Sequence, residues 1–410
     1  MPPETGYSAR PDTVPVERSD RLSGRLLANP MKIVVLGSKG ISIADGAGGI
    51  ERGVEEVALR LAALGHEVIV YERGRSFGLR HERGVTVRSV PFLNSKNLAT
   101  WSHAAVSMAD SLVHFRGVEI YHIHGVRNGF LCLVARLLTR ARIIFHLHGA
   151  EWRSDKWGLT TGWLLRAGCV IGAFAAHQIA TVCTQCSSIL GLVPFSQRKT
   201  SLVPNGLPRV DGAAPITGAT LAARGLAHDS PFILFVGRLV PQKRTDLLIR
   251  AFKSIESRTR LLIVGPSSHC VAYEEMLHAL AHNDRRIIFV GPVAFDAIGE
   301  LYRECLAVVL PSQTEGCSNV LLEALAYGCC IVTSDIPANR DVVQDAALLF
   351  KSDDLGSLTD ALSEVLHNRA AVDRARSAAQ IRSRTMWDWD AVTREFLRLY
   401  AASAPVHDSP

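Results

Sequence analysis

The sequence of 410 residues lacks several features that would assign it to a specialised class of protein. Its 45 basic and 39 acidic residues are dispersed rather than gathered in runs, and it contains no nucleic-acid-binding motif. The formal net charge of +6 is small for this length. Such a charge permits attraction to phosphate-bearing ligands or to an anionic membrane surface, but it identifies neither. We therefore expect no nucleic-acid partner.

Disulfide and zinc frameworks are also missing. The nine cysteines are odd in number, and most of them lie in apolar stretches. This usage indicates reduced, buried thiols in a cytoplasmic protein. Cys183 and Cys186 form a C-x-x-C pair, but no second pair accompanies it. The pair therefore does not predict a zinc site.

Neither a secretory leader nor a membrane span is indicated. Residues 1–30 are rich in Pro, Arg and Ser without an apolar core, so we expect a disordered tail. The most apolar long stretch, 163–183, is interrupted by Arg166, His177 and Gln178. It predicts a buried helix followed by a strand rather than a transmembrane segment. We expect a cytoplasmic protein, with peripheral contact at the inner face of the membrane left open.

Buried strands and amphipathic helices alternate along the rest of the chain. "KIVVLGS" is typical of a buried parallel strand, and a glycine-rich loop and a helical pattern follow it. The alternation restarts after Asn205-Gly206 with "PFILFVGR". The pattern predicts an α/β protein with two Rossmann-like domains facing each other across a cleft. The expected domains are 31–205 and 206–385, with a final helix at about 386–402 that packs back on the first.

Ligands of such sheets bind at the carboxyl ends of the strands, and cations follow one of these ends. Arg238 comes directly after the strand "PFILFVG", and Lys243 precedes the next helix. Two cations beside a helix start predict an anion site, although solvated loop cations would give the same pattern. Gly48 and Gly49 stand at the equivalent place in the first domain, as a phosphate-binding loop or a flexible turn. Together the two loops predict a bound diphosphate.

The stretch "TEGCSNVLLEALAYG" places two glutamates around an apolar run. Glu315 lies on the loop after a strand, and Ser318 is the expected N-cap of the following helix. Glu323 falls near the second turn of that helix, where an unpartnered buried carboxylate would be costly. We expect both acids to face the cleft and to accept hydrogen bonds from sugar hydroxyls.

In the stretch "FHLHGAEWR", two histidines stand at the end of an expected strand. Strand alternation puts His146 and His148 on one face, with His148 nearer the cleft. His148 could donate hydrogen bonds or act as an acid or base, whereas His146 fits a structural role better. His124, at the end of "YHIHG", is expected to be structural or a minor residue of the wall.

Taken with "GGIERGVEEVALRLAALGHEVIVY", "VPNG" and "GRLVPQKRTDLLIRAF", these motifs resemble those of the family-4 retaining glycosyltransferases. The resemblance runs from Met31 to about Tyr400 and implies the two-Rossmann GT-B fold. The Glu-x7-Glu spacing is the family's signature. "HGAEWRSDKWG" is similar to bacterial, rhamnosyltransferase-like members that act in cell-surface polysaccharide assembly. The chain departs from the family at Asp341, where Glu is usual.

The resemblance implies a role for each candidate residue. The donor diphosphate would be bound by Gly48, Gly49, Arg238 and Lys243. The donor sugar, ribose and base would be bound by Val293, Glu315, Cys317, Ser318, Asn319 and Glu323. His148 and Glu315 would stand beside the reacting sugar as the catalytic candidates. The implied reaction moves a sugar, with retention, from a nucleotide-diphosphate sugar to a hydroxyl of a glycan or lipid-linked acceptor in surface polysaccharide biosynthesis.

Metal is not expected to take part in this reaction. Arg238, Lys243 and the amides of a helix start would stabilise the charge that develops on the diphosphate. The sequence shows no Asp-x-Asp motif in a suitable place, and we expect no cofactor apart from the donor substrate. Two other hypotheses remain open, a nucleotide-sugar epimerase on the same fold and a non-catalytic sugar-nucleotide-binding relic.

Overall fold

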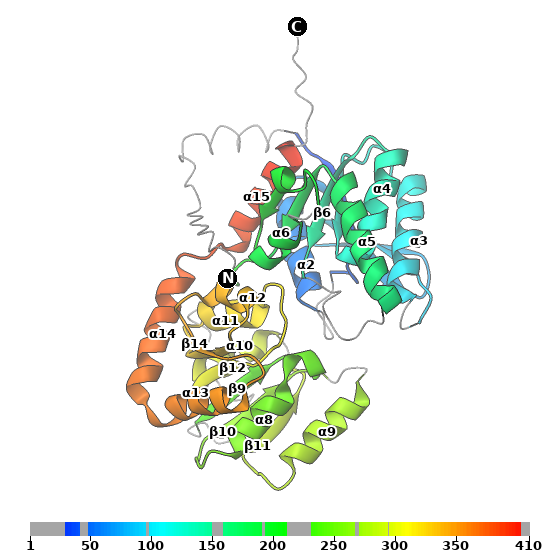
Figure 1. Ribbon diagram of the computed structural model, residues 1–410. Helices are drawn as coiled ribbons and strands as arrows, with labels where there is room; N and C mark the ends of the chain where they lie inside the picture. The colour runs from blue at the N-terminus through cyan, green and yellow to red at the C-terminus, as the bar shows by residue number, and fades with distance from the viewer. Residues whose placement is uncertain are drawn as a thin grey trace.

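The computed structural model describes residues 29–41, 48–95, 98–149, 159–190, 193–210, 231–266, 270–293 and 295–402. These residues form two α/β domains, each built on a largely parallel sheet with helices on both faces (Figure 1). The fold predicted from the sequence is therefore confirmed. Residues 1–28 of the expected tail lie outside the described residues.

The first domain contains an eight-stranded sheet in the order β3-β4-β2-β1-β5-β6-β7-β8. Its strands are β1 (Lys32–Leu36), β2 (Glu67–Gly74), β3 (Gly78–Glu82), β4 (Val85–Pro91), β5 (Ile120–His124), β6 (Arg142–Leu147), β7 (Gln178–Thr181) and β8 (Thr200–Leu202). All neighbours pair in parallel except β3 and β4. The carboxyl ends of the parallel strands therefore share one edge, where ligands of open sheets bind.

Helices cover both faces of this sheet because its strands are apolar on both sides. The helices are α2 (Gly49–Ala63), α3 (Ala99–His114), α4 (Gly129–Leu138), α5 (Leu159–Ala175), α6 (Thr184–Leu190) and α15 (Trp389–Ala402). One face of β1, through Ile33 and Val35, packs against α2 and α15. The other face, through Val34 and Leu36, packs against α3, α4 and α5. The helix α15, at the C-terminal end of the described residues, thus completes the core of the first domain.

The second domain is built on a six-stranded parallel sheet in the order β11-β10-β9-β12-β13-β14. Its strands are β9 (Phe232–Val236), β10 (Arg260–Val264), β11 (Ile287–Gly291), β12 (Ala307–Leu310), β13 (Ile331–Ser334) and β14 (Leu348–Phe350). Its helices are α8 (Thr245–Lys253), α9 (Val271–Ala281), α10 (Phe295–Glu304), α11 (Asn319–Ala326), α12 (Pro337–Val343), α13 (Leu355–His367) and α14 (Arg369–Ser383).

The prediction of a buried helix in the stretch 163–183 is wrong in one respect. The helix α5 and the strand β7 are present, but α5 is buried on one side only. Trp163 is 67% exposed and Phe174 is 79% exposed. Hydropathy alone could not show this, because a helix that is apolar on all sides can still be docked through a single face. Among the described residues, none of the helices combines the length and the apolar character that crossing a membrane requires.

The prediction that most of the cysteines are buried is confirmed. All nine are free, and all are buried apart from Cys270 and Cys317, which are partly exposed. The sulfur atoms of Cys183 and Cys186 lie 3.3 Å apart, too far for a disulfide bond.

Candidate active site

Glu323 is buried where the two domains meet. The helix α11 that carries it begins at Asn319, and Ser318 caps it by accepting a hydrogen bond from the Leu321 amide, as the sequence predicts. The Oε1 atom of Glu323 lies 2.6 Å from Nη1 of Arg52 on α2, and the hydroxyl of Tyr302 donates to Oε2 at 2.6 Å. Burial raises the pKa of Glu323, while the Arg52 guanidinium and the Tyr302 hydrogen bond oppose that shift.

The partners of Glu323 were not found by sequence reasoning. Glu323 was expected to accept hydrogen bonds from sugar hydroxyls. In this structure its carboxylate bonds instead to Arg52 of the first domain and Tyr302 of the second. One signal for Arg52 was present, because it lies in the first turn of α2, three residues after Gly49. Tyr302, on α10, gave no such signal, since its position depends on the packing of α10 against α11.

Lys243 and Glu315 form the second charged pair of the site. The Nζ atom of Lys243 lies 2.5 Å from Oε1 of Glu315, and both side chains are less than one-fifth exposed. The loops that carry them are joined by a backbone hydrogen bond of 2.9 Å from the amide of Gln313 to the carbonyl of Gln242. The structure therefore brings together the loop after β9 and the loop after β12, which sequence reasoning had treated separately.

Arg238 stands on the same loop as Lys243 but remains exposed to solvent. It follows Gly237 at the end of β9, and the Lys243 side chain passes 3.8 Å from the position that a Cβ on Gly237 would take. Among the described residues, the Arg238 side chain makes no hydrogen bond to another candidate residue. Its guanidinium is therefore accessible to an anionic ligand.

The starts of α2 and α11 lie against each other. Gly48 is the N-cap of α2, and Gly49 is its first residue. The side-chain amide of Asn319 donates to the carbonyl of Gly49 at 3.5 Å, and an added Cβ on Gly49 would lie 3.3 Å from the same nitrogen. Helix starts present unpaired amides and a partial positive charge, so two of them together form an anion-binding environment.

Asn205 connects these helix starts to the joint between the domains. Its side-chain amide donates to Oδ1 of Asn319 at 2.7 Å and to the carbonyl of Cys317 at 3.2 Å. The Cys317 carbonyl is therefore occupied, and burial raises the pKa of the Cys317 thiol to about 12. Val293 is half-buried just after β11 and packs against the core beneath α11.

His148 is held against the loop that carries Glu315. An added Cβ on Gly316 would lie 1.8 Å from the carbonyl oxygen of His148, so the two loops are in direct backbone contact. The Nε2 atom of His148 lies 2.8 Å from Nδ1 of His124. Burial lowers the pKa of His148 to about 3, so its imidazole is neutral at pH 7. Neutral imidazole has one donor and one acceptor nitrogen.

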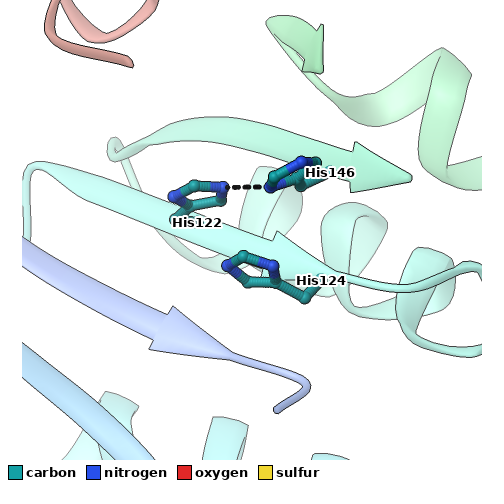
Figure 2. Close-up of side chains that lie close together, drawn as sticks. All are labelled: His122, His124 and His146. Carbon is teal, nitrogen blue, oxygen red and sulfur yellow. Dashed lines mark hydrogen bonds between the residues drawn. The ribbon is translucent and has the colours of Figure 1, made fainter. Parts of the chain in front are cut away.

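Three further histidines lie next to His148, two of them in ring contact or hydrogen-bond contact with it. Figure 2 shows these three, His122, His124 and His146. His122 and His124 stand on β5, and His146 stands on the neighbouring strand β6. The Nε2 atom of His122 lies 3.2 Å from Nδ1 of His146, and its Nδ1 atom lies 2.8 Å from the hydroxyl of Tyr400. The prediction that His146 and His148 share a face is confirmed, since their ring centroids are 4.1 Å apart.

This histidine group is where the described part of the chain could hold a metal ion. Ligand atoms of His122, His124 and His146 all lie within 4.8 Å of one another, and imidazole suits zinc, copper or nickel. In this structure the imidazoles bond to Tyr400, to His148 or to one another. The cavity beside them has a volume of about 20 Å³, room for about one water molecule. The group is too enclosed to receive a sugar.

A further contact between the domains involves Asp341, where the chain departs from the family pattern. Its Oδ2 atom accepts hydrogen bonds from the amide and the hydroxyl of Thr184, at 2.8 and 2.7 Å. Thr184 is the first residue of α6, and Asp341 lies on α12. This acid therefore caps a helix of the opposite domain, a role that sequence reasoning did not anticipate.

Two family profiles match the chain. Residues 219–382 match the family described as Glycosyl transferases group 1, and residues 47–209 match Glycosyltransferase Family 4. The D-inositol 3-phosphate glycosyltransferase of Frankia alni is 30% identical over 390 residues, which cover 86% of this chain and 94% of that protein. The protein of the same name from Acidothermus cellulolyticus is 28% identical over 377 residues, which cover 83% of each chain.

Solved structures of glycosyltransferases share this architecture. Anabaena HepE in complex with UDP-glucose has a TM-score of 0.74 at 16% identity, covering 91% of this chain and 100% of that chain. Sucrose-phosphate synthase from Thermosynechococcus elongatus has a TM-score of 0.74 at 19% identity, covering 91% and 98%. At these identities the likeness shows the fold, two Rossmann-like domains facing across a cleft.

Proposed function

The chain belongs to the glycosyl transferases of group 1, and from that premise we propose that it transfers a sugar from a nucleotide-diphosphate donor with retention and without a metal. The observation that carries the proposal is the convergence at the domain boundary of the Lys243–Glu315 pair, the Arg52–Glu323 pair and two helix starts. Cations and unpaired amides suit a diphosphate, and carboxylates suit the hydroxyls of its sugars.

In the proposed donor complex, each candidate residue contacts a particular part of the nucleotide sugar. Arg238 and Lys243 bind the diphosphate together with the amides at Gly48 and Gly49, and they stabilise the charge that develops as it leaves. Glu323 accepts the ribose hydroxyls in place of Arg52. Glu315 accepts hydroxyls of the transferred sugar, and residues 317–319 border that sugar and the phosphate. Val293 holds the base through its backbone.

The chemical step breaks the anomeric C–O bond to the diphosphate and forms a new C–O bond to the acceptor on the same face of the sugar. The acceptor hydroxyl loses its proton to the leaving phosphate oxygen, so the step needs no metal-bound base. His148, which is neutral at pH 7, donates a hydrogen bond to the reacting sugar and carries no charge that would oppose a developing oxocarbenium ion. Contact between the domains excludes water and suppresses hydrolysis.

Two classes of acceptor are proposed. The first is a hydroxyl of a glycan or lipid-linked acceptor in bacterial surface polysaccharide biosynthesis. The motif "HGAEWRSDKWG" is the basis for this class. The second is a phosphorylated cyclitol or sugar, because relatives at 26–30% identity carry the name D-inositol 3-phosphate glycosyltransferase. We place the enzyme in the cytoplasm, where nucleotide sugars are available and the nine free cysteines stay reduced.

A donor screen tests the proposal. The purified full chain is incubated with UDP-, GDP-, ADP- and dTDP-sugars, with EDTA throughout, and with either a bacterial membrane extract or inositol phosphate. Release of nucleoside diphosphate with sugar on one acceptor supports transfer, and the anomeric configuration of the product by NMR reports retention. An isomerised donor without transfer would indicate an epimerase, and binding without turnover would indicate a relic. Activity only without EDTA would contradict the metal-free mechanism.

A further inference from the structure

The outer faces of α4 and α5 form an apolar surface on the first domain. The exposed apolar side chains are Leu137 and Leu138 on α4 and Trp163, Leu164, Val170 and Phe174 on α5, each exposed by 48% or more. Positions 163, 170 and 174 recur at helical spacing, so they share one side of α5. Figure 1 shows the two helices side by side on the flank of the domain that lies away from α15. We call this surface the α4–α5 face.

Glycines fix the two helices in this orientation. An added Cβ on Gly129 of α4 would lie 1.9 Å from the carbonyl oxygen of Gly168 on α5. An added Cβ on Gly172 would lie 2.8 Å from the Cα of Gly129. The helices therefore meet backbone to backbone on their inner sides. This close approach leaves the large apolar side chains of α5 directed outward.

A further exposed aromatic side chain lies on the segment that follows α6. The Nζ atom of Lys199 donates to the carbonyls of Phe174 and Ala176 at 3.1 and 2.7 Å, which holds the segment after α6 against the last turn of α5. Phe195, on that segment, is 81% exposed and has a left-handed φ of 63°. A bulky aromatic residue in this conformation is a backbone outlier, and here it stands in solvent.

Among the described residues, the charged side chains on and just after α4 and α5 are all basic. Neither residues 120–150 nor residues 156–210 contain an aspartate or a glutamate. Arg136, Arg140 and Arg166 are exposed on or directly after α4 and α5. The one acid of the neighbouring helix α3, Asp110, is buried and paired with Arg88 at 2.7 Å. The α4–α5 face is therefore both apolar and basic.

We propose that the α4–α5 face docks on an anionic lipid bilayer. A helix with outward apolar side chains and flanking arginines lies in the plane of the membrane, with its apolar side buried and its cations near lipid phosphates. Trp163 fits that boundary, because tryptophan is enriched at membrane–water interfaces. The guanidinium of Arg166 lies 5.6 Å from the centre of the Trp163 ring, so a cation accompanies the proposed anchor.

The position of the face suits a membrane-bound substrate. The helix α5 follows β6 and His148, so its N-terminal end, with Trp163 in the second turn, lies near the edge of the sheet where the strands end. A bilayer under the α4–α5 face would therefore lie beside the entrance to the cleft. The docking itself does not depend on the proposed function. Delivery of a lipid-linked acceptor from this surface does rest on it.

A second copy of the chain is the competing occupant of the face. Isologous dimers place the same patch of both subunits together. Such a contact would bring Arg136, Arg140 and Arg166 of both copies into one interface, with no acid in 120–150 or 156–210 to compensate. A bilayer that contains anionic lipids supplies that compensating charge, and for this reason we favour it.

Vesicle flotation tests the proposal with the full chain, on vesicles of phosphatidylcholine with 30 mol% phosphatidylglycerol and on phosphatidylcholine alone. We expect binding to the anionic vesicles that weakens with added salt. The triple variant Leu137→Ser/Trp163→Ser/Phe174→Ser should bind about tenfold more weakly or worse. The variant Arg140→Gln/Arg166→Gln should lose about fivefold for each arginine.

The matched control is Val271→Ser/Ile381→Ser, which removes exposed apolar side chains from α9 and α14 of the second domain. It should bind vesicles like the wild type, and circular dichroism checks that every variant is folded. Absence of binding to anionic vesicles would overturn the proposal, as would binding that the triple variant retains. A dimer in sedimentation velocity that only the triple variant loses, without vesicle binding, would assign the face to a second copy. Vesicle binding without sugar transfer would leave the docking intact and contradict only the proposed function.

Discussion

Nη1 of Arg52 lies 2.6 Å from Oε1 of Glu323, so an arginine of the first domain holds the carboxylate that we propose for the donor ribose. Both side chains are about one-tenth exposed. The pair joins the two domains, and a donor that bonds Glu323 has to replace Arg52 as its partner. The same exchange would leave the guanidinium beside the site of the diphosphate.

The Arg52–Glu323 pair should couple strongly in a double-mutant cycle. Because both partners are largely buried, each single change leaves a charge without its main partner. We expect Arg52→Ala, Glu323→Ala and the double variant to give a coupling free energy of about 1–3 kcal/mol in urea unfolding. The surface pair Arg369–Asp373, with 70% and 57% exposed side chains, should give about 0.5 kcal/mol or less. Equal coupling in both cycles would contradict the structural role of the Arg52–Glu323 pair.

Lys243 should contribute to donor affinity. Replacing it by Met removes a cation from the proposed diphosphate site and leaves Glu315 without its partner at 2.5 Å. Since a hydrogen bond to a charged group contributes about 1.5–3 kcal/mol, nucleoside diphosphate should bind roughly 10- to 100-fold more weakly. Calorimetric titration measures this change. Lys351→Met, at a side chain that is 80% exposed, is the control and should bind as the wild type does. Unchanged affinity in Lys243→Met would remove the lysine from the site.

Gly316 should be intolerant of a side chain. An added Cβ would lie 1.8 Å from the carbonyl oxygen of His148, so Gly316→Ala must separate the loops that carry His148 and Glu315. We expect sugar transfer to fall about 100-fold or more, because a displacement of about 1 Å in a catalytic group has that effect. The measurement is the initial rate with the best donor. Gly162→Ala, where an added Cβ meets nothing within 4 Å, should keep full activity. A Gly316→Ala enzyme with normal turnover would show that this contact is dispensable.

The buried histidines should make the protein sensitive to acid. Burial lowers the pKa of His122 and His148 to about 3, from about 6.5 in an unfolded chain. Between pH 6.5 and 3 the unfolded state therefore binds protons that the folded state does not. The free energy of unfolding is therefore highest, with respect to these histidines, above pH 6.5. Below that pH it falls by about 1.4 kcal/mol per pH unit for each histidine that stays neutral in the folded state. Urea unfolding at pH 7, 6 and 5 measures the slope.

Removing one of these histidines should reduce that slope. His122→Phe loses the bonds to Tyr400 and His146, so it is less stable at pH 7, but its free energy of unfolding should fall less steeply with acid. The reduction expected is about 1.4 kcal/mol per pH unit. His367→Gln, at an exposed position on α13, should keep the wild-type slope. Identical slopes in the wild type and His122→Phe would show that His122 is protonated in the folded state.

Local patterns in the sequence were sufficient for the fold. The alternation of apolar strands and amphipathic helices predicted both sheets, and the Ser318 cap followed from the residues around one helix start. Period-two alternation likewise placed His146 and His148 on one face. Each of these inferences depends on residues that are near one another in the chain.

Contacts between distant segments could not be predicted in the same way. Arg52 reaches Glu323 across 271 positions, and Tyr400 reaches His122 across 278. Both depend on how complete domains and helices pack, which no single segment encodes. The exposure of α5 was missed for a related reason. An apolar sequence does not reveal which side of a helix a neighbouring helix covers. Here the close approach of α4 and α5 at Gly129, Gly168 and Gly172 determines which side of α5 is covered.

We propose above all that one site between the domains binds the diphosphate of a nucleotide sugar. Its most direct test is a calorimetric titration of the wild-type chain and of Arg238→Glu with UDP, GDP, ADP and dTDP. We predict that at least one of these nucleotides binds the wild type and that charge reversal at Arg238 abolishes its binding. If Arg238→Glu bound the same nucleotide with wild-type affinity, the assignment of the diphosphate to this loop would be contradicted.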